Sequence, residues 1–331
     1  MKNKLIDRPT TEADTQKTAF LPILLATVCL TLTLLSAVID RFVYPFGGEI
    51  LSPALAQIII LLIPTYLCIM IASPESSAIE QMRGIGIGSL HAEYIFFMIF
   101  ASMFTITSSL LLDMLFGGVT HNAEGFTLLA TFTAGEGDHT AAYPYLIFVY
   151  AIIPAVAEEL LFRGIVFSEM KKISRPVAVC VSSVLHALFA FSLGNLPSAL
   201  LSGGIYCFIL VTTGSLQACM IVHFIYNVFA LFLGTNISAY FISTPSKGLL
   251  IIIVIAAWLL SSALFFGESS RIYRENAKNK ASDKTAPHSC RLFSKNTVRE
   301  LLDTFSLKST LICGIVCIAL YISILIICSL K

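Results

Sequence analysis

Three ionisable side chains lie in the middle of a long apolar stretch. Residues 145–170 are mostly apolar but contain Glu158, Glu159 and Arg163. If this stretch forms one helix, Glu158 lies roughly 20 Å from either end, because each residue advances the helix by about 1.5 Å. A charge at that depth costs about 3 kcal/mol on insertion scales, so it needs a partner and usually has a function. Glu159 and Arg163 are four residues apart and can pair on one face, whereas Glu158 points about 100° away from that face.

Two later apolar stretches contain polar side chains that suit a partnership with Glu158. His186 lies in the first, and His223 and Asn227 lie four residues apart in the second. If both stretches enter the membrane from the cytoplasm, His186 lies about 15 Å deep and His223 about 9 Å deep, with Asn227 one turn deeper. We therefore expect these four side chains to form one site in the middle to inner half of the membrane.

Such a set of side chains suits hydrolysis. A carboxylate in a dry pocket becomes more basic and can take a proton from water. A histidine can orient that water, while a second histidine and an amide can donate hydrogen bonds to the oxyanion of a tetrahedral intermediate. Glu158, His186 and His223 are also acceptable zinc ligands, with water in the fourth position. The sequence leaves hydrolysis with and without Zn²⁺ open, and no other cofactor is expected.

The composition is that of a membrane protein. Of 331 residues, 56% are hydrophobic and 12% are charged, whereas soluble domains carry about 25% charged residues. We predict an all-α, polytopic integral membrane protein with about eight core transmembrane helices and one C-terminal transmembrane helix. The nine stretches long enough to span about 30 Å of hydrocarbon are residues 19–44, 52–73, 92–116, 143–170, 176–194, 197–213, 215–234, 247–267 and 309–330.

Lysine and arginine residues set the orientation. With the N-terminus in the cytoplasm, 17 of the 21 basic residues lie on the cytoplasmic side and three lie outside, with Arg163 inside the membrane. This asymmetry is what the positive-inside rule requires. The segments are then a cytoplasmic N-terminal segment (1–18), N-terminal helices with an outside loop (19–141), a core (142–235), a last core helix (236–267), a basic cytoplasmic linker (268–308) and a C-terminal helix (309–331).

The ordered motifs resemble those of the CPBP family. Glu158-Glu159-x-x-x-Arg163 inside a helix, a histidine on the next helix and His223-x-x-x-Asn227 two helices later carry the resemblance, over roughly residues 142–235. That family comprises the CAAX-processing endoproteases of the Rce1 type and the bacterial bacteriocin-processing, or Abi, proteins. The resemblance implies an intramembrane endopeptidase that acts on a peptide or protein substrate.

The resemblance also implies roles for single residues. Glu158 would activate the water and His186 would complete the base, while Glu159 and Arg163 would support the site as a pair. His223 and Asn227 would hold the oxyanion or a metal. One position departs from the family pattern, which usually has phenylalanine four residues before the second-motif histidine. The residue there is Ser182.

Two other classes of protein remain as alternatives. A non-catalytic immunity or partner-binding membrane protein could keep the same fold and use the polar core for recognition. A proton-coupled transporter is the weaker alternative, because transporters are built from repeated halves with interrupted helices, and no such pairing is found here. In each case we expect an integral plasma-membrane protein of bacterial type that contacts the lipid bilayer and binds no nucleic acid.

Overall fold

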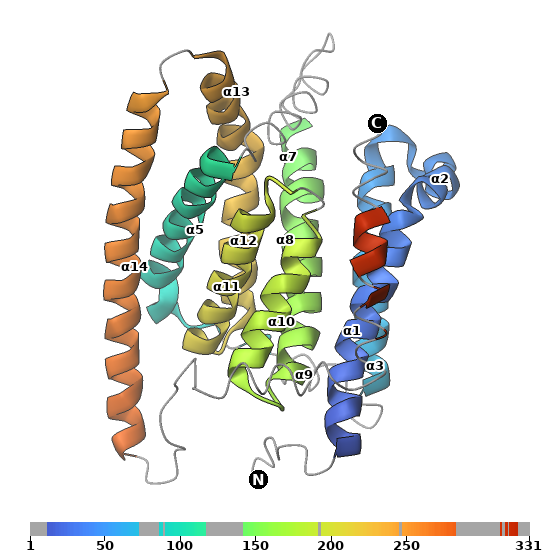
Figure 1. Ribbon diagram of the computed structural model, residues 1–331, viewed down its shortest axis with the longest axis horizontal. Helices are drawn as coiled ribbons and strands as arrows, with labels where there is room; N and C mark the ends of the chain where they lie inside the picture. The colour runs from blue at the N-terminus through green and yellow to red at the C-terminus, as the bar shows by residue number, and fades with distance from the viewer. Residues whose placement is uncertain are drawn as a thin grey trace. The chain divides into compact units, whose positions relative to one another are not determined.

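The computed structural model describes 12–72, 86–88, 90–116, 142–190, 193–244, 247–282, 312, 315–316 and 318–323 (Figure 1). All regular structure in these residues is helical, and none of them forms a strand. The chain divides into two compact units. Unit 1 comprises residues 1–86, 157–191 and 291–331, and unit 2 comprises residues 87–156 and 192–290.

Among the described residues, five helices are long and apolar enough to cross a membrane, which makes the chain an integral membrane protein. They are Ala92–Phe116, Tyr143–Met170, Leu196–Thr213, Leu216–Gly234 and Gly248–Glu275. Three shorter apolar helices, Phe20–Thr33, Ala54–Met70 and Arg175–Leu188, coincide with three more of the expected stretches. The all-α class is therefore confirmed, and the count of eight core helices plus one is not. The expected helix at 309–330 lies largely outside the described residues.

The expected first helix at 19–44 is wrong in its extent. The structure has α1 (Glu12–Leu34) and α2 (Ser36–Gln57), separated at Leu35. Just before this break, Thr27 Oγ1 donates to the carbonyl of Ile23 and Thr31 Oγ1 to that of Thr27, each at 2.8 Å. Such bonds to the carbonyl four residues earlier often bend a helix.

Unit 1 is built from the first helices and from the segment that carries the glutamates. Its elements include α1, α2, η1 (Ile58–Leu62), α3 (Ile63–Ala72), the end of α8 (Ile153–Glu159), η5 (Leu160–Phe167), α9 (Ser168–Met170) and α10 (Arg175–Leu188). α10 packs against η5 and α9, and α1 packs against α3, η5 and α9. η5 is a π-helix in which all residues from Leu161 to Phe167 are buried.

Unit 2 is organised around α5 (Ile95–Phe116). The other elements are η2 (Ala92–Tyr94), α7 (Ala142–Ile147), η4 (Phe148–Ile152), the start of α8, α11 (Leu196–Thr213), α12 (Leu216–Phe229), η6 (Ala230–Gly234), α13 (Thr235–Ser243) and α14 (Gly248–Ser282). α5 packs against α11, α12 and α14 (Figure 1). At the contact with α14, Phe265 stacks on Phe97 and Phe104, with ring centroids 5.5 and 5.0 Å apart.

Local sequence signals begin the helices that carry the histidines. Ser174 caps α10, where its Oγ accepts a hydrogen bond from Val177 N, and Pro176 occupies the first turn. α11 ends at Thr213 and is followed by Gly214, whose φ of +68° is a left-handed conformation that glycine adopts without strain. Ser215 then caps α12 by accepting a hydrogen bond from Ala218 N. Serine caps of this kind satisfy otherwise unpaired N–H groups and so fix where a helix begins.

The last core helix is longer than expected. α14 does not end at residue 267 but continues to Ser282, so the first part of the expected linker is helical. Arg271 supports this extension, since its guanidinium contacts Glu268 and also bonds to Glu275 at 2.9 Å. Both pairs have the three- or four-residue spacing that stabilises a solvated helix. Residues 283–308 lie outside the described residues.

Candidate active site

Glu159 and Arg163 form a fully buried ion pair inside the transmembrane helix. Arg163 Nη1 lies 3.0 Å from Glu159 Oε1, and both side chains are 0% exposed. Glu159 ends α8 and Arg163 lies in η5, where the four-residue spacing keeps both on one face. The pairing expected from the sequence is therefore present. Because each charge neutralises the other, the pair can remain in an apolar interior where either group alone would be very unfavourable.

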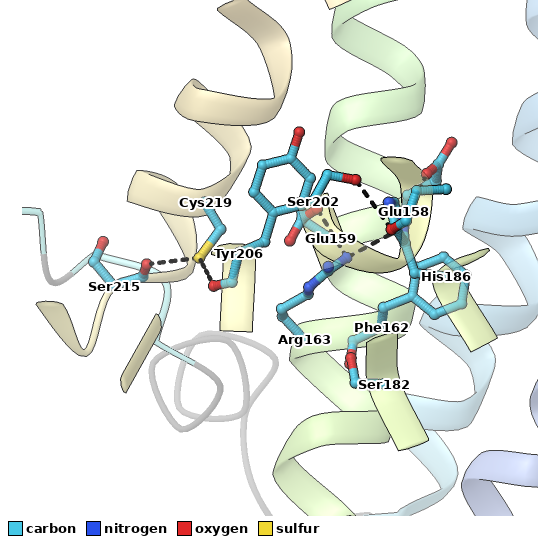
Figure 2. A network of polar contacts seen from close by, with 11 residues as sticks. Glu158, Glu159, Phe162, Arg163, Ser182, His186, Ser202, Tyr206, Ser215 and Cys219 are labelled. Carbon is cyan, nitrogen blue, oxygen red and sulfur yellow. Dashed lines mark hydrogen bonds and ion pairs between the residues drawn. The ribbon is translucent and has the colours of Figure 1, made fainter. Parts of the chain in front are cut away.

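Glu158 meets His186 from the neighbouring helix. Its Oε2 lies 3.5 Å from His186 Nδ1, and the contact brings α8 and α10 together within unit 1 (Figure 2). The Glu158 side chain is 23% exposed, whereas that of Glu159 is 0% exposed. The two adjacent glutamates are thus distinguished by access as well as by partner. Of these two glutamates, Glu158 is the one that combines a histidine neighbour with access from outside the packed core.

His186 Nδ1 faces a cation as well as a carboxylate. The same nitrogen lies 3.4 Å from Arg163 Nη1 and 3.5 Å from Glu158 Oε2. Arginine can only donate a hydrogen bond, whereas an ionised carboxylate can only accept one. Nδ1 must therefore be unprotonated to bind Arg163 and protonated to bind Glu158. The arrangement makes the position of one imidazole proton decide which neighbour is bound.

The ring of Phe162 packs against the imidazole of His186. The Phe162 ring lies 5.3 Å from it, centroid to centroid, at an interplanar angle of 85°. Phe189 lies 5.2 Å from Phe162 at 74°. The Arg163 guanidinium carbon is 5.8 Å from the centre of the Phe162 ring. Phe162 was not among the residues expected at the site, because an apolar residue in an apolar run gives no signal in a single sequence.

His223 lies in unit 2 and is held by an aromatic partner. Its ring stacks on Tyr206 with centroids 4.9 Å apart and planes 21° apart, and its side chain is 4% exposed. Tyr206 belongs to α11 and is tied to α12, because Cys219 Sγ donates to the Tyr206 carbonyl at 3.3 Å (Figure 2). The Tyr206 ring that stacks on His223 therefore belongs to a backbone that is hydrogen-bonded to α12, the helix that carries His223.

Asn227 lies one turn after His223 and contacts main chain. Its Nδ2 donates to the carbonyl of Ala151 at 3.4 Å, from α12 to the π-helix η4 in unit 2. The bond indicates that the amide joins two helices, which is the common role of asparagine in membrane proteins.

The structure gathers the expected site residues into two groups. Glu158, Glu159, Arg163 and His186 form one within unit 1, and His223 and Asn227 belong to unit 2. The expectation that all of them share one site stays a prediction.

One buried carboxylate was missed by the sequence reasoning. Asp113 lies in α5, within the span Ala92–Phe116, and is 3% exposed. It lies near Tyr226 of α12, whose hydroxyl is hydrogen-bonded to Ser109. An acidic residue three positions from the end of an apolar run can be taken for a boundary residue. Its position next to the helix that carries His223 and Asn227 shows that it belongs to the polar packing of unit 2.

The described side chains do not form a three-ligand metal site. A catalytic zinc ion takes three protein ligands and a water, and within the described residues no group of three or more His, Cys, Asp or Glu side chains could hold a metal ion. The adjacent donors Glu158 and His186 also have the guanidinium of Arg163 3.4 Å from the imidazole nitrogen. A fixed positive charge at that distance opposes the binding of a second cation.

A family model of known proteins matches the segment that contains both groups of expected site residues. Residues 140–229, which are 90 of the 331 residues, match the family model of the type II CAAX prenyl endopeptidase Rce1-like proteins. The match confirms the family resemblance and supports a protease of the CAAX type embedded in the membrane. No curated protein and no solved structure matched the chain.

Proposed function

We propose that the chain is an intramembrane endopeptidase that hydrolyses a peptide bond with water activated by Glu158 and His186. The observation that carries this proposal is the contact between Glu158 and His186 beside a buried ion pair, at 3.5 Å. Four ionisable groups so close together inside a membrane protein are energetically unfavourable, and this cost indicates that they serve a function. Residues 140–229 also match a family of endopeptidases.

Glu158 is the general base in this proposal. Its carboxylate is the more accessible of the two glutamates, so it can reach a water molecule while Glu159 stays bound to Arg163. Glu158 takes one proton from the water as the water oxygen attacks the carbonyl carbon of the peptide bond. The products of this step are a protonated carboxyl group on Glu158 and a tetrahedral intermediate with a negatively charged oxygen.

In the second half of the reaction, His186 accepts a hydrogen bond from protonated Glu158. When the C–N bond breaks, the leaving nitrogen needs a proton, and the proton taken by Glu158 is the source. Nδ1 of His186 lies within 3.5 Å of Glu158 and can receive a hydrogen bond from its protonated form. Arg163 favours the unprotonated Nδ1 that this requires. Breakdown then restores the ionised Glu158 and releases an acid and an amine.

His223 and Asn227 are the proposed donors to the oxyanion. Both can supply an N–H group, and a single donor of this kind contributes about 10²–10³ to the rate of acyl transfer. The support is their order and spacing within the matched segment and the burial of His223. The Asn227 amide has a second N–H besides the one directed at Ala151, so a packing role and an oxyanion role are compatible.

Glu158→Gln tests the proposal, with Glu169→Gln as the matched control. Both changes replace a carboxylate by an amide of the same shape, but Glu169 lies on α9 and pairs with Lys172, which follows that helix. Purified full-length protein in lipid vesicles would be assayed on fluorogenic peptides with and without a farnesylated cysteine near the C-terminus. We expect Glu158→Gln to lower turnover by about 10²–10⁴ while Glu169→Gln retains it. Full function in folded Glu158→Gln would defeat the proposal and favour the partner-binding alternative.

A further inference from the structure

Ser182 makes a buried hydrogen bond to the helix that carries the glutamates. It lies on α10, and its Oγ donates to the carbonyl of Phe162 at 2.9 Å. Both residues are 0% exposed, so water cannot replace this bond if it is lost. The bond fixes α10 against η5 one helical turn before His186 (Figure 2).

Phe162 connects this bond to the imidazole of His186. The carbonyl that Ser182 holds belongs to the residue whose ring packs nearly perpendicular to His186, at 5.3 Å between centroids. The same ring packs against Phe189, immediately after the end of α10. Holding the Phe162 backbone therefore also holds the surface against which the imidazole lies.

His186 needs such support because of its place in the helix. α10 ends at Leu188, two residues later, and the last turn of a helix is the part that frays. Nδ1 must nevertheless stay near both Glu158 Oε2 and Arg163 Nη1, at 3.5 and 3.4 Å. A half-turn of the ring about its Cβ–Cγ bond would put a carbon atom in that place and break both contacts.

We propose that Ser182 is a positioning residue for His186, which acts by holding Phe162 so that Nδ1 of the imidazole faces Glu158 and Arg163. This proposal rests on the proposed role of His186 in hydrolysis. The π-helix η5 is part of the arrangement, because it presents the Phe162 carbonyl to the neighbouring helix. π-Helical segments inside α-helices occur frequently at functional sites.

Ser183 provides a matched control in the next position of the same helix. It is also buried, at 5% exposed, but its hydroxyl has no hydrogen-bond partner among the described residues. Ser182→Ala and Ser183→Ala therefore remove the same atom from adjacent buried sites, and only the first removes a contact with Phe162. A general effect of deleting a buried hydroxyl would be shared by the two variants.

The decisive measurement is the tautomer of His186. The full chain, labelled with ¹⁵N-histidine and reconstituted in lipid bilayers, would be studied by solid-state NMR, with His186 assigned among the six histidines from its missing signals in His186→Gln. We expect Ser182→Ala to change the populations of protonated and unprotonated Nδ1, while Ser183→Ala matches the wild type. Unchanged His186 nitrogen signals in Ser182→Ala would overturn the proposal.

Two further arms separate this proposal from the proposed function. Phe162→Leu removes the ring but keeps the carbonyl, so it should change the His186 signals in the same way even if Ser182→Ala does not fold. On a cleaved peptide, Ser182→Ala should lower kcat by about 10- to 100-fold with KM unchanged, because misplaced catalytic groups cost rate. If Glu158→Gln retains full function, the hydrolysis proposal fails, and the NMR result still decides the role of Ser182.

Discussion

Units 1 and 2 place polar groups inside the membrane in different ways. Unit 1 holds charges, and its Glu159–Arg163 pair is wholly buried. Unit 2 contains the buried Asp113 but otherwise ties its helices together with neutral groups. Examples are the Trp258 indole that donates to Ser108 at 3.1 Å and the hydroxyl bond between Thr107 and Ser261 at 2.8 Å. Neutral bonds between membrane helices are worth about 0.6 kcal/mol on average, whereas a charge costs about 3 kcal/mol or more to insert.

A buried charge in this protein indicates a function more strongly than a neutral hydrogen bond does. Neutral bonds such as that of Trp258 are explained by packing alone, because each contributes a little stability. Charges such as Glu158 are not, because apolar residues of similar volume would stabilise the protein as well or better. His223 and Asn227 are therefore the informative cases. They lie in the unit where polar groups serve packing, yet they are proposed to take part in the chemistry of the other unit.

The largest expected effect comes from the two histidines. His186→Ala and His223→Ala should each lower turnover by about 10²–10⁴, and the double variant should lose little more than the worse single one, since members of one catalytic unit act non-additively. Peptide cleavage at equal protein amounts would measure this. Additive losses would separate the two units into independent roles, and normal turnover in His223→Ala would restrict the site to unit 1.

Arg163→Ala should have the largest effect on stability. It leaves Glu159 buried without its guanidinium, which typically costs about 3–5 kcal/mol. The unfolding temperature of the protein in lipid should fall strongly in Arg163→Ala, and Lys172→Ala serves as the control. That lysine is 41% exposed in its pair with Glu169, so its change should be below about 1 kcal/mol. An Arg163→Ala protein that is fully stable but inactive would assign the arginine directly to catalysis.

Asn227→Ala separates packing from chemistry in unit 2. If Asn227 only joins helices, its loss should cost about 0.6–1.7 kcal/mol of stability and leave kcat unaffected. As an oxyanion donor, its loss should also lower kcat by about 10²–10³. We expect both effects. Unfolding curves and kinetics on the same preparation would distinguish the two roles.

Trp258→Phe should have a small effect confined to stability. It removes the indole N–H that bonds to Ser108 but keeps an aromatic ring between α14 and α5. We expect a loss of about 0.6 kcal/mol and normal turnover, with Ser262→Ala on the exposed face of α14 as the control. A large loss of activity would show that unit 2 contributes more than packing at this position.

Removal of metal should have the smallest effect of all. Activity and unfolding temperature should be unchanged after dialysis against a chelator, because the proposed mechanism relies on the side chains of Glu158, His186, His223 and Asn227 and on no metal ion. Metal analysis of the purified protein would accompany the assay. Stoichiometric zinc, with activity lost on chelation and restored by zinc, would replace the general-base mechanism with a metal-assisted one.

The sequence predicted those features that depend on nearby residues. The Glu159–Arg163 pair follows from a spacing of four on one helix. The separation of α11 from α12 follows from Gly214 and Ser215, whose preferences for a left-handed turn and a helix cap act locally. Long apolar runs likewise predicted the membrane class.

Features that depend on contacts between distant residues were not predictable in this way. The roles of Phe162 and Ser182 arise only when α10 packs against η5. The break at Leu35 lies inside an apolar run, and the composition of that run does not indicate it. The extension of α14 to Ser282 depends on the weak pairs around Arg271, which offset a polar sequence that otherwise reads as a linker.

The intrahelical pairing of Arg163 also bears on how the protein is made. The ribosome completes the segment containing Glu159 and Arg163 before it reaches α10, so His186 cannot assist when this helix enters the bilayer. A partner four residues away is present from the start and lowers the barrier to insertion of both charges. Glu158 has to wait for a helix synthesised later. The contact between Glu158 and His186 can therefore form only after α10 has been synthesised.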